Sequence, residues 1–123
     1  MSPKYIIIPL LSILLSACYY DNEEELFPAQ ANLTCEATMA TFVTDVSPIL
    51  VTYCTRCHRV DRTDGGVNLE GYDQVFPFVN NGSLLGSVKH EGGFNAMPPS
   101  GGMIPGCDIQ KISLWIDAGA ANN

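Results

Sequence analysis

Five consecutive residues, Cys54-Thr55-Arg56-Cys57-His58, limit what this chain can fold into more than any other stretch. Two cysteines separated by two residues and followed at once by histidine form the attachment signal for c-type haem. Each thiol adds to a vinyl group of the porphyrin, and the short turn fixes the macrocycle on the chain. The histidine can then bind the iron as its proximal ligand. The motif predicts one covalent haem c, held by Cys54 and Cys57, with His58 on the iron.

Three other interpretations of the motif stay open at this point. One is half of a zinc site, but zinc usually takes four ligands and no second C-x-x-C or H-x-x-x-H pair follows. Another is a thioredoxin-like redox pair, which needs alternating strands and helices, and strand signals are scarce. The third is a structural disulfide, which is disfavoured between cysteines this close. Haem attachment also requires an exported chain.

The first 17 residues have the features of an export signal. Lys4 gives a positive start, residues 5–15 form an apolar run too short to span a bilayer, and small residues close it. The run ends in Leu-Ser-Ala-Cys18, which resembles the lipobox of bacterial lipoproteins. This resemblance implies cleavage before Cys18 and its acylation, which makes a stable membrane anchor. A plain secretory signal with a coincidental cysteine is the alternative.

Residues 18–34 are interpreted as a lipidated, flexible, acidic tether, because they hold a run of acidic residues and no periodic apolar pattern. Tyr19 follows the acylated cysteine where an aspartate would signal inner-membrane retention, so the resemblance favours the outer membrane. The acidic run resembles a surface-export tag, or it is a solvated spacer. We therefore expect a lipid anchor in the cell envelope, at the outer membrane, facing the periplasm or the cell surface.

Residues 35–123 are expected to form one all-α domain of three to four short helices. Apolar spacing predicts a first helix that Thr44 or Ser47 caps and that leads into the motif. Further helices are expected over residues 69–76, ending before Pro77, and over 83–89 and 108–118. A domain this short has difficulty building a sufficient core, and a buried haem would add to it.

The stretch from Phe42 to Ala120 resembles the class I cytochromes c. The resemblance lies in Phe-x-x-Asp-Val-x-Pro-Ile-Leu before the motif and in Leu-Trp-Ile followed by Gly-Ala near the end. It implies a small class I cytochrome c-like fold around one haem. The family often has a proline that orients the proximal histidine, and no proline lies between His58 and Phe76. We expect a loop carbonyl to hold the His58 ring instead.

Residues 91–102 contain too much glycine and proline for regular structure. Met97 and Pro98 resemble the distal methionine loop of the cytochromes, which implies that Met97 is the second iron ligand. The alternatives are that Met97 is a loop hydrophobe or that His90 is the ligand. His90 lies between two charged residues, which indicates a solvated position. We therefore expect Met97 to face His58 and His90 to point elsewhere.

The two remaining cysteines, Cys35 and Cys107, are predicted to form a disulfide. Five cysteines are present, of which one is assigned to lipid and two to haem. In an oxidising compartment the last two are expected to pair. The bond would join the first residues of the domain to the start of its last helix. Two free or buried thiols are the alternative.

These features predict an electron-transfer c-type cytochrome with His/Met ligation. Its partners would be a redox protein donor and acceptor, with the membrane bound through the lipid. Both axial positions are filled, so no iron site is open to substrate and the protein is not expected to be an enzyme. From Ala37 onward eight acidic residues face five basic ones, which argues against nucleic acid. The alternatives are a haem-based sensor or small peroxidase with a displaceable distal ligand, or a structural metal-binding surface lipoprotein.

Overall fold

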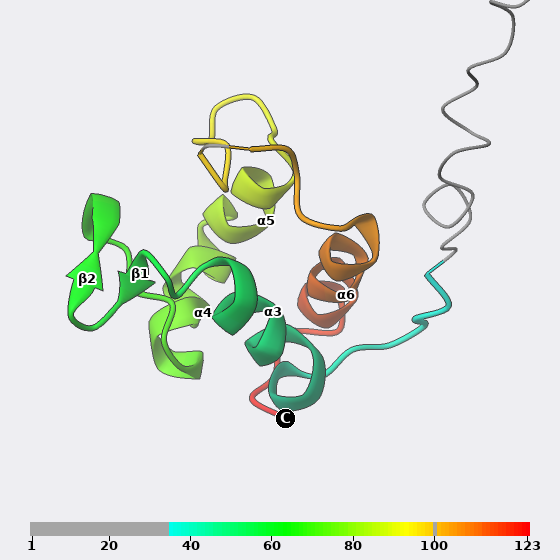
Figure 1. The fold of residues 1–123 in the computed structure, drawn as a ribbon. Helices are drawn as coiled ribbons and strands as arrows, with labels where there is room; N and C mark the ends of the chain where they lie inside the picture. The colour runs from blue at the N-terminus through cyan, green and yellow to red at the C-terminus, as the bar shows by residue number, and fades with distance from the viewer. Residues whose placement is uncertain (1–34, 100) are drawn as a thin grey trace, which may run out of the picture. The chain divides into compact units, whose positions relative to one another are not determined.

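The computed structural model describes residues 35–99 and 101–123, which form a small, mostly helical domain (Figure 1). The predicted helical domain is therefore confirmed. The predicted signal peptide, the tether and Cys18 lie outside the described residues. None of the helices in the described ranges is long and apolar enough to cross a membrane. The elements, in chain order, are η1 (Phe42–Val46), α3 (Ser47–Tyr53), β1 (His58–Arg59), β2 (Arg62–Thr63), η2 (Asp64–Gly66), α4 (Tyr72–Asn80), α5 (Ser83–Val88) and α6 (Gly106–Asp117).

The first helix begins earlier than the apolar spacing predicts. Thr41 is extended, with φ −117° and ψ 158°, and the π-helical turn η1 starts at Phe42 and continues into α3. The Thr41 N–H donates to Asp45 Oδ2 at 2.9 Å, so a carboxylate satisfies a donor at the helix start. The prediction that Thr44 or Ser47 caps this helix is wrong, because both residues lie inside the helical stretch.

Helix α4 also differs from its prediction, because it continues to Asn80 with Pro77 inside it. Proline lacks the N–H that a helix interior uses, and its ring crowds the preceding turn. The helix persists because Val75 is fully buried and Phe76 and Val79 pack partly buried against the core. Packing thus outweighs the local cost of Pro77.

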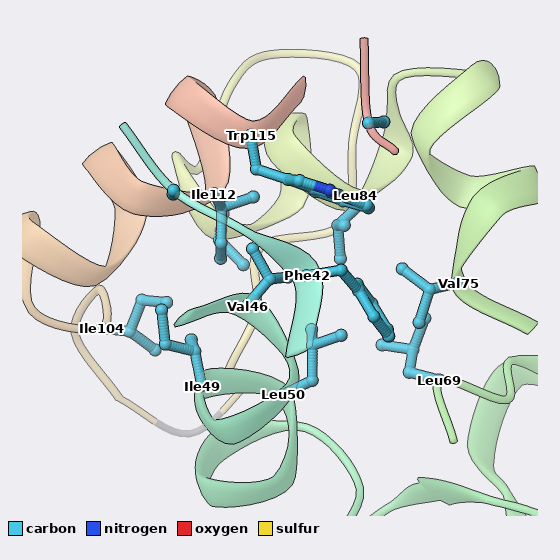
Figure 2. Packing of buried hydrophobic residues seen from close by; sticks show 13 residues of the cluster. Phe42, Val46, Ile49, Leu50, Leu69, Val75, Leu84, Ile104, Ile112 and Trp115 are labelled. Carbon is cyan, nitrogen blue, oxygen red and sulfur yellow. The ribbon is translucent and has the colours of Figure 1, made fainter. Parts of the chain in front are cut away.

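The core joins both ends of the domain (Figure 2). Trp115 from α6 is 1% exposed, and its ring centroid lies 5.4 Å from that of Phe42 in η1. Tyr72 from α4 meets Phe42 edge-on, with centroids 5.2 Å apart. Aromatic pairs at these separations add to the stabilisation from burial alone. The buried apolar set is Ala40, Phe42, Val46, Ile49, Leu50, Leu69, Val75, Leu84, Val88, Ile104, Ile112, Trp115 and Ala120.

The last residues of the domain lie against its first helix. The Trp115 Nε1–H donates to the Ala121 carbonyl at 2.8 Å, which folds the chain back after α6. The Phe42 N–H then donates to Asn123 Oδ1 at 3.0 Å, and the Val43 N–H donates to the Asn123 carbonyl at 2.8 Å. Two N–H groups in the first turn of η1 are therefore satisfied by the far end of the domain.

The residues before η1 are joined to α6. Cys35 and Cys107, the pair expected from the sequence, are bonded in the structure, with their sulfur atoms 2.05 Å apart. The Gln110 side chain also donates to the Ala37 carbonyl at 3.2 Å. Both links attach the start of the described chain to the first turns of α6.

Candidate functional site

The Cys-x-x-Cys-His motif continues the helical turn that ends α3. The Cys54 N–H donates to the Leu50 carbonyl at 2.8 Å. The N–H groups of Cys57 and His58 both donate to the Cys54 carbonyl, at 3.1 and 3.0 Å. The two cysteines and the histidine therefore stand on one tight turn at the end of α3. Leu50, which is 2% exposed, fixes this helix in the core.

A hairpin follows the motif where the sequence predicted only a polar loop. Strand β1 pairs antiparallel with β2, so that His58 lies opposite Thr63. The His58 carbonyl also accepts the Leu69 N–H at 2.9 Å, which ties the backbone of the histidine to a buried residue. Arg62 donates to Asp64 at 3.0 Å, and this bond holds the pKa of the Asp64 carboxyl below its usual value. The two-residue strands are too short to show an alternating pattern in the sequence.

The chain around Met97 is irregular and mostly exposed, as residues 91–96 all are. Met97 itself is half-buried, and its N–H donates to the Ser87 carbonyl at 3.0 Å. His90 Nε2 lies 3.1 Å from the Met97 carbonyl oxygen. His90 is half-buried, so the prediction of a solvated position is wrong. His90 does not line the cavity between the motif and the methionine loop.

A cavity of about 570 Å³ lies between the motif and the methionine loop. Cys54, Cys57, His58 and Met97 all line it, so the structure brings the predicted attachment and ligand residues together. Its volume falls within the range of about 300–1,000 Å³ that cofactor sites occupy. Arg56 is the one residue of permanent charge among the described residues of the lining. The apolar part of the lining includes Val67, Leu69, Phe78, Leu84, Val88 and Ile104.

The His58 ring lacks the support that the sequence predicted. Its Nδ1 atom is buried and has no hydrogen-bond partner among the described residues. The expected hydrogen bond to a loop carbonyl is therefore absent from this part of the chain. A buried polar atom without a partner costs about 1–3 kcal/mol, so such atoms mark sites that need an explanation. Ligation of a bound group explains this atom only if Nδ1 is itself the ligand, because the second ring nitrogen of a ligating histidine normally donates to a protein group or to water.

The two cysteines of the motif are free thiols and are not bonded to each other. Burial raises the pKa of the Cys54 thiol to about 11, so it stays protonated at neutral pH. No group of three or more His, Cys, Asp or Glu side chains gathers within the described ranges. Two thiols, an imidazole and a thioether that line one cavity are the groups that would attach a haem c and bind its iron.

Phe94 is a cavity residue that sequence reasoning missed. A Cβ atom placed on Gly86 would lie 2.3 Å from the nearest atom of the Phe94 ring, so the ring packs directly on the backbone of α5. Phe94 lines the cavity, as do Leu84 and Val88 of α5. An isolated glycine inside an apolar helix was the available signal, because such a glycine often has a packing reason.

Comparison of the chain with protein-family models, with curated proteins and with solved structures finds no match.

Proposed function

We propose that this protein is a mono-haem c-type cytochrome that carries single electrons, with His58 and Met97 as the axial ligands of one haem c. One observation carries the proposal. The two thiols, the imidazole and the thioether that such a protein needs all line the same cavity, although Met97 lies far along the chain from the motif.

Each group in the cavity has a role in this proposal. When bound, the haem supplies reversible one-electron chemistry at its iron. Cys54 and Cys57 hold it through thioether bonds, while His58 and Met97 serve as the iron ligands. The apolar part of the lining would lie against the macrocycle and disfavour the more highly charged ferric state, which raises the reduction potential. Arg56 offers a cation that can pair with the haem carboxylates.

The proposal also places the protein in the cell envelope, anchored by lipid on Cys18 at the outer membrane. The supporting evidence is the lipobox-like sequence at the end of the apolar run. Its redox donor and acceptor would then be proteins of the same compartment. Replacing Cys18 with Ser should move the protein from the membrane pellet to the soluble fraction. Cys18→Ser protein that still sediments with membranes after a high-salt wash contradicts the anchor.

The deciding experiment is production of the full chain together with haem-maturation machinery. A pyridine haemochrome assay should find one covalent haem per chain, and the ferric protein should show the methionine–iron charge-transfer band. Protein that carries no covalent haem under these conditions overturns the proposal and favours a structural metal-binding lipoprotein.

A second candidate is a haem-based sensor or small peroxidase in which Met97 is displaced from the iron. The exposure of all residues from 91 to 96 favours it, because a solvated loop opens at low cost. Carbon monoxide distinguishes the two candidates. The electron carrier should leave the ferrous spectrum unchanged when the gas is added, whereas the sensor or peroxidase should bind it.

A further inference from the structure

His90 adopts a backbone conformation that side chains rarely take. Helix α5 ends at Val88, and His90 follows two residues later with φ +55°. The His90 N–H donates to the Ser87 carbonyl at 3.2 Å, and the Glu91 N–H donates to the Gly86 carbonyl at 2.9 Å. These two bonds make a Schellman motif, in which the left-handed position usually holds glycine. Glycine would end the helix at lower conformational cost, so helix termination alone does not explain a histidine at this position.

The His90 side chain provides a reason through its contact with Met97. Its Nε2 lies 3.1 Å from the Met97 carbonyl oxygen in a partly buried position. A carbonyl only accepts hydrogen bonds, so Nε2 carries the proton and donates. On the other side of the same residue, the Met97 N–H donates to the Ser87 carbonyl at 3.0 Å. The two backbone polar groups of Met97 are therefore satisfied by Ser87 in the last turn of α5 and by His90 just after it.

This arrangement transmits the rigidity of α5 to an otherwise loose segment. Leu84 and Val88 of α5 are 5% and 3% exposed, so the helix is fixed in the core. Residues 91–96 are exposed and include two glycines, and they leave Met97 free to move unless its backbone is held. A thioether is a weak ligand for iron, so the strength with which Met97 binds the metal depends on how well the chain holds its side chain in place.

We propose that His90 is a positioning residue, which clamps the Met97 backbone and thereby keeps the thioether in the cavity. This inference rests on the proposed function, because it assigns His90 to the support of the distal ligand. It also gives the second histidine a role different from iron ligation.

Three substitutions separate the clamp from a merely structural role. His90→Gly suits the left-handed backbone better than histidine does, but it removes the donor. His90→Asn tolerates the same backbone, but its amide is one bond too short to reach. His90→Gln places an amide N–H at the same number of bonds from Cα as Nε2. If His90 only ends the helix, glycine should be neutral or better by every measure.

The test displaces the distal ligand with free imidazole in the haem-loaded ferric proteins. Loss of the methionine–iron charge-transfer band measures the displacement. Loss of one hydrogen bond should lower the dissociation constant of imidazole roughly three- to tenfold in His90→Gly and His90→Asn. His90→Gln should recover most of the wild-type value. The Met97 amide proton should exchange with solvent faster in the glycine variant by a similar factor.

The outcomes distinguish this inference from the proposed function. If wild-type protein has one haem and the methionine band, and His90→Gly matches it in imidazole affinity and amide exchange, the clamp is refuted and the cytochrome assignment stands. If wild-type protein has haem but no methionine band, and His90→Gly changes its axial ligation, His90 is itself a ligand and the clamp is refuted. Wild-type protein without covalent haem overturns both.

Discussion

The two walls of the cavity are built in different ways. The motif wall continues α3, with backbone hydrogen bonds inside the turn and with Ile49 and Leu50 buried beneath it at 7% and 2% exposure. The methionine wall is an exposed loop that is held at Met97 by hydrogen bonds to Ser87 of α5 and to His90, which follows α5. Under the proposed function the two walls would have different roles. The rigid motif wall would capture the cofactor, and the loop would adjust the properties of the iron.

The largest effect should come from removing the motif thiols. In the double variant Cys54→Ser, Cys57→Ser, no thioether can form, so covalent haem should be lost completely. The pyridine haemochrome assay on denatured, washed protein measures this loss. Thr55→Ser, in the same turn, is the matched control and should keep one haem per chain. Haem that stays bound to the double variant through denaturation would show that the motif wall is not the point of capture.

Trp115→Ala tests the core on which both walls depend. Trp115 is 1% exposed and contacts Phe42, so its truncation should lower the free energy of unfolding by about 3–5 kcal/mol. Chemical denaturation of the haem-free and haem-loaded proteins measures the change. Val51→Ala, at a position 63% exposed on α3, should stay within about 0.5 kcal/mol of wild type. A loss below about 1 kcal/mol for Trp115→Ala would contradict the packing described.

Met97→Ala should affect the methionine wall and leave the motif wall unchanged. We expect the covalent haem to remain, because the motif wall is unchanged, while the methionine–iron band disappears and carbon monoxide binds the ferrous protein. The reduction potential should fall, since methionine opposite histidine raises it. Met103→Ala is the control, because Met103 is 56% exposed and does not line the cavity. A retained band in Met97→Ala would refute the ligand assignment.

The smallest expected effect concerns pH and Asp45, which lies away from both walls. The backbone N–H of Thr41, and to a lesser degree Lys111, lowers the pKa of the Asp45 carboxyl from its ordinary value of 3.8. Its folded pKa is below its unfolded one, so its stabilising effect is present above about pH 4 and is lost as pH falls through the folded pKa.

Asp45→Asn should therefore cost about 0.5 kcal/mol of unfolding free energy at pH 7, because the amide oxygen can still accept the Thr41 N–H and only the charge, with its attraction to Lys111, is lost. Denaturation midpoints of the two proteins should converge as the pH falls below 4. A difference that is constant from pH 7 to pH 2 would show that the Asp45 charge has no part in it.

The sequence predicted the parts of the fold that local patterns control. The helix before the motif, α5 and α6 follow apolar spacing, and the four side chains expected at the haem do line one cavity. The errors arose where the folded domain overrides a local pattern. The start of η1 is held by Asp45 nearby and by Asn123 at the far end of the domain. The persistence of α4 through Pro77 depends on burial of Val75, and the local sequence does not show what buries that side chain.

At the candidate site, the environment of His90 likewise could not be predicted from the local sequence. Its charged neighbours are typical of solvated surface, and that pattern gave the wrong environment. The left-handed backbone and the contact with the Met97 carbonyl arise only when the loop closes on α5. The distal region could therefore be located from its prolines and glycines, but its internal support could not.

The contact between Asn123 and the first turn of η1 also makes the helix before the motif sensitive to a change at a distant residue. The Phe42 N–H and the Val43 N–H both donate to Asn123, so a substitution or a backbone shift there removes the partners of two donors at the start of this helix. A label or tag fused next to residue 123 is therefore a perturbation of the motif's own helix, although the two are far apart in the sequence.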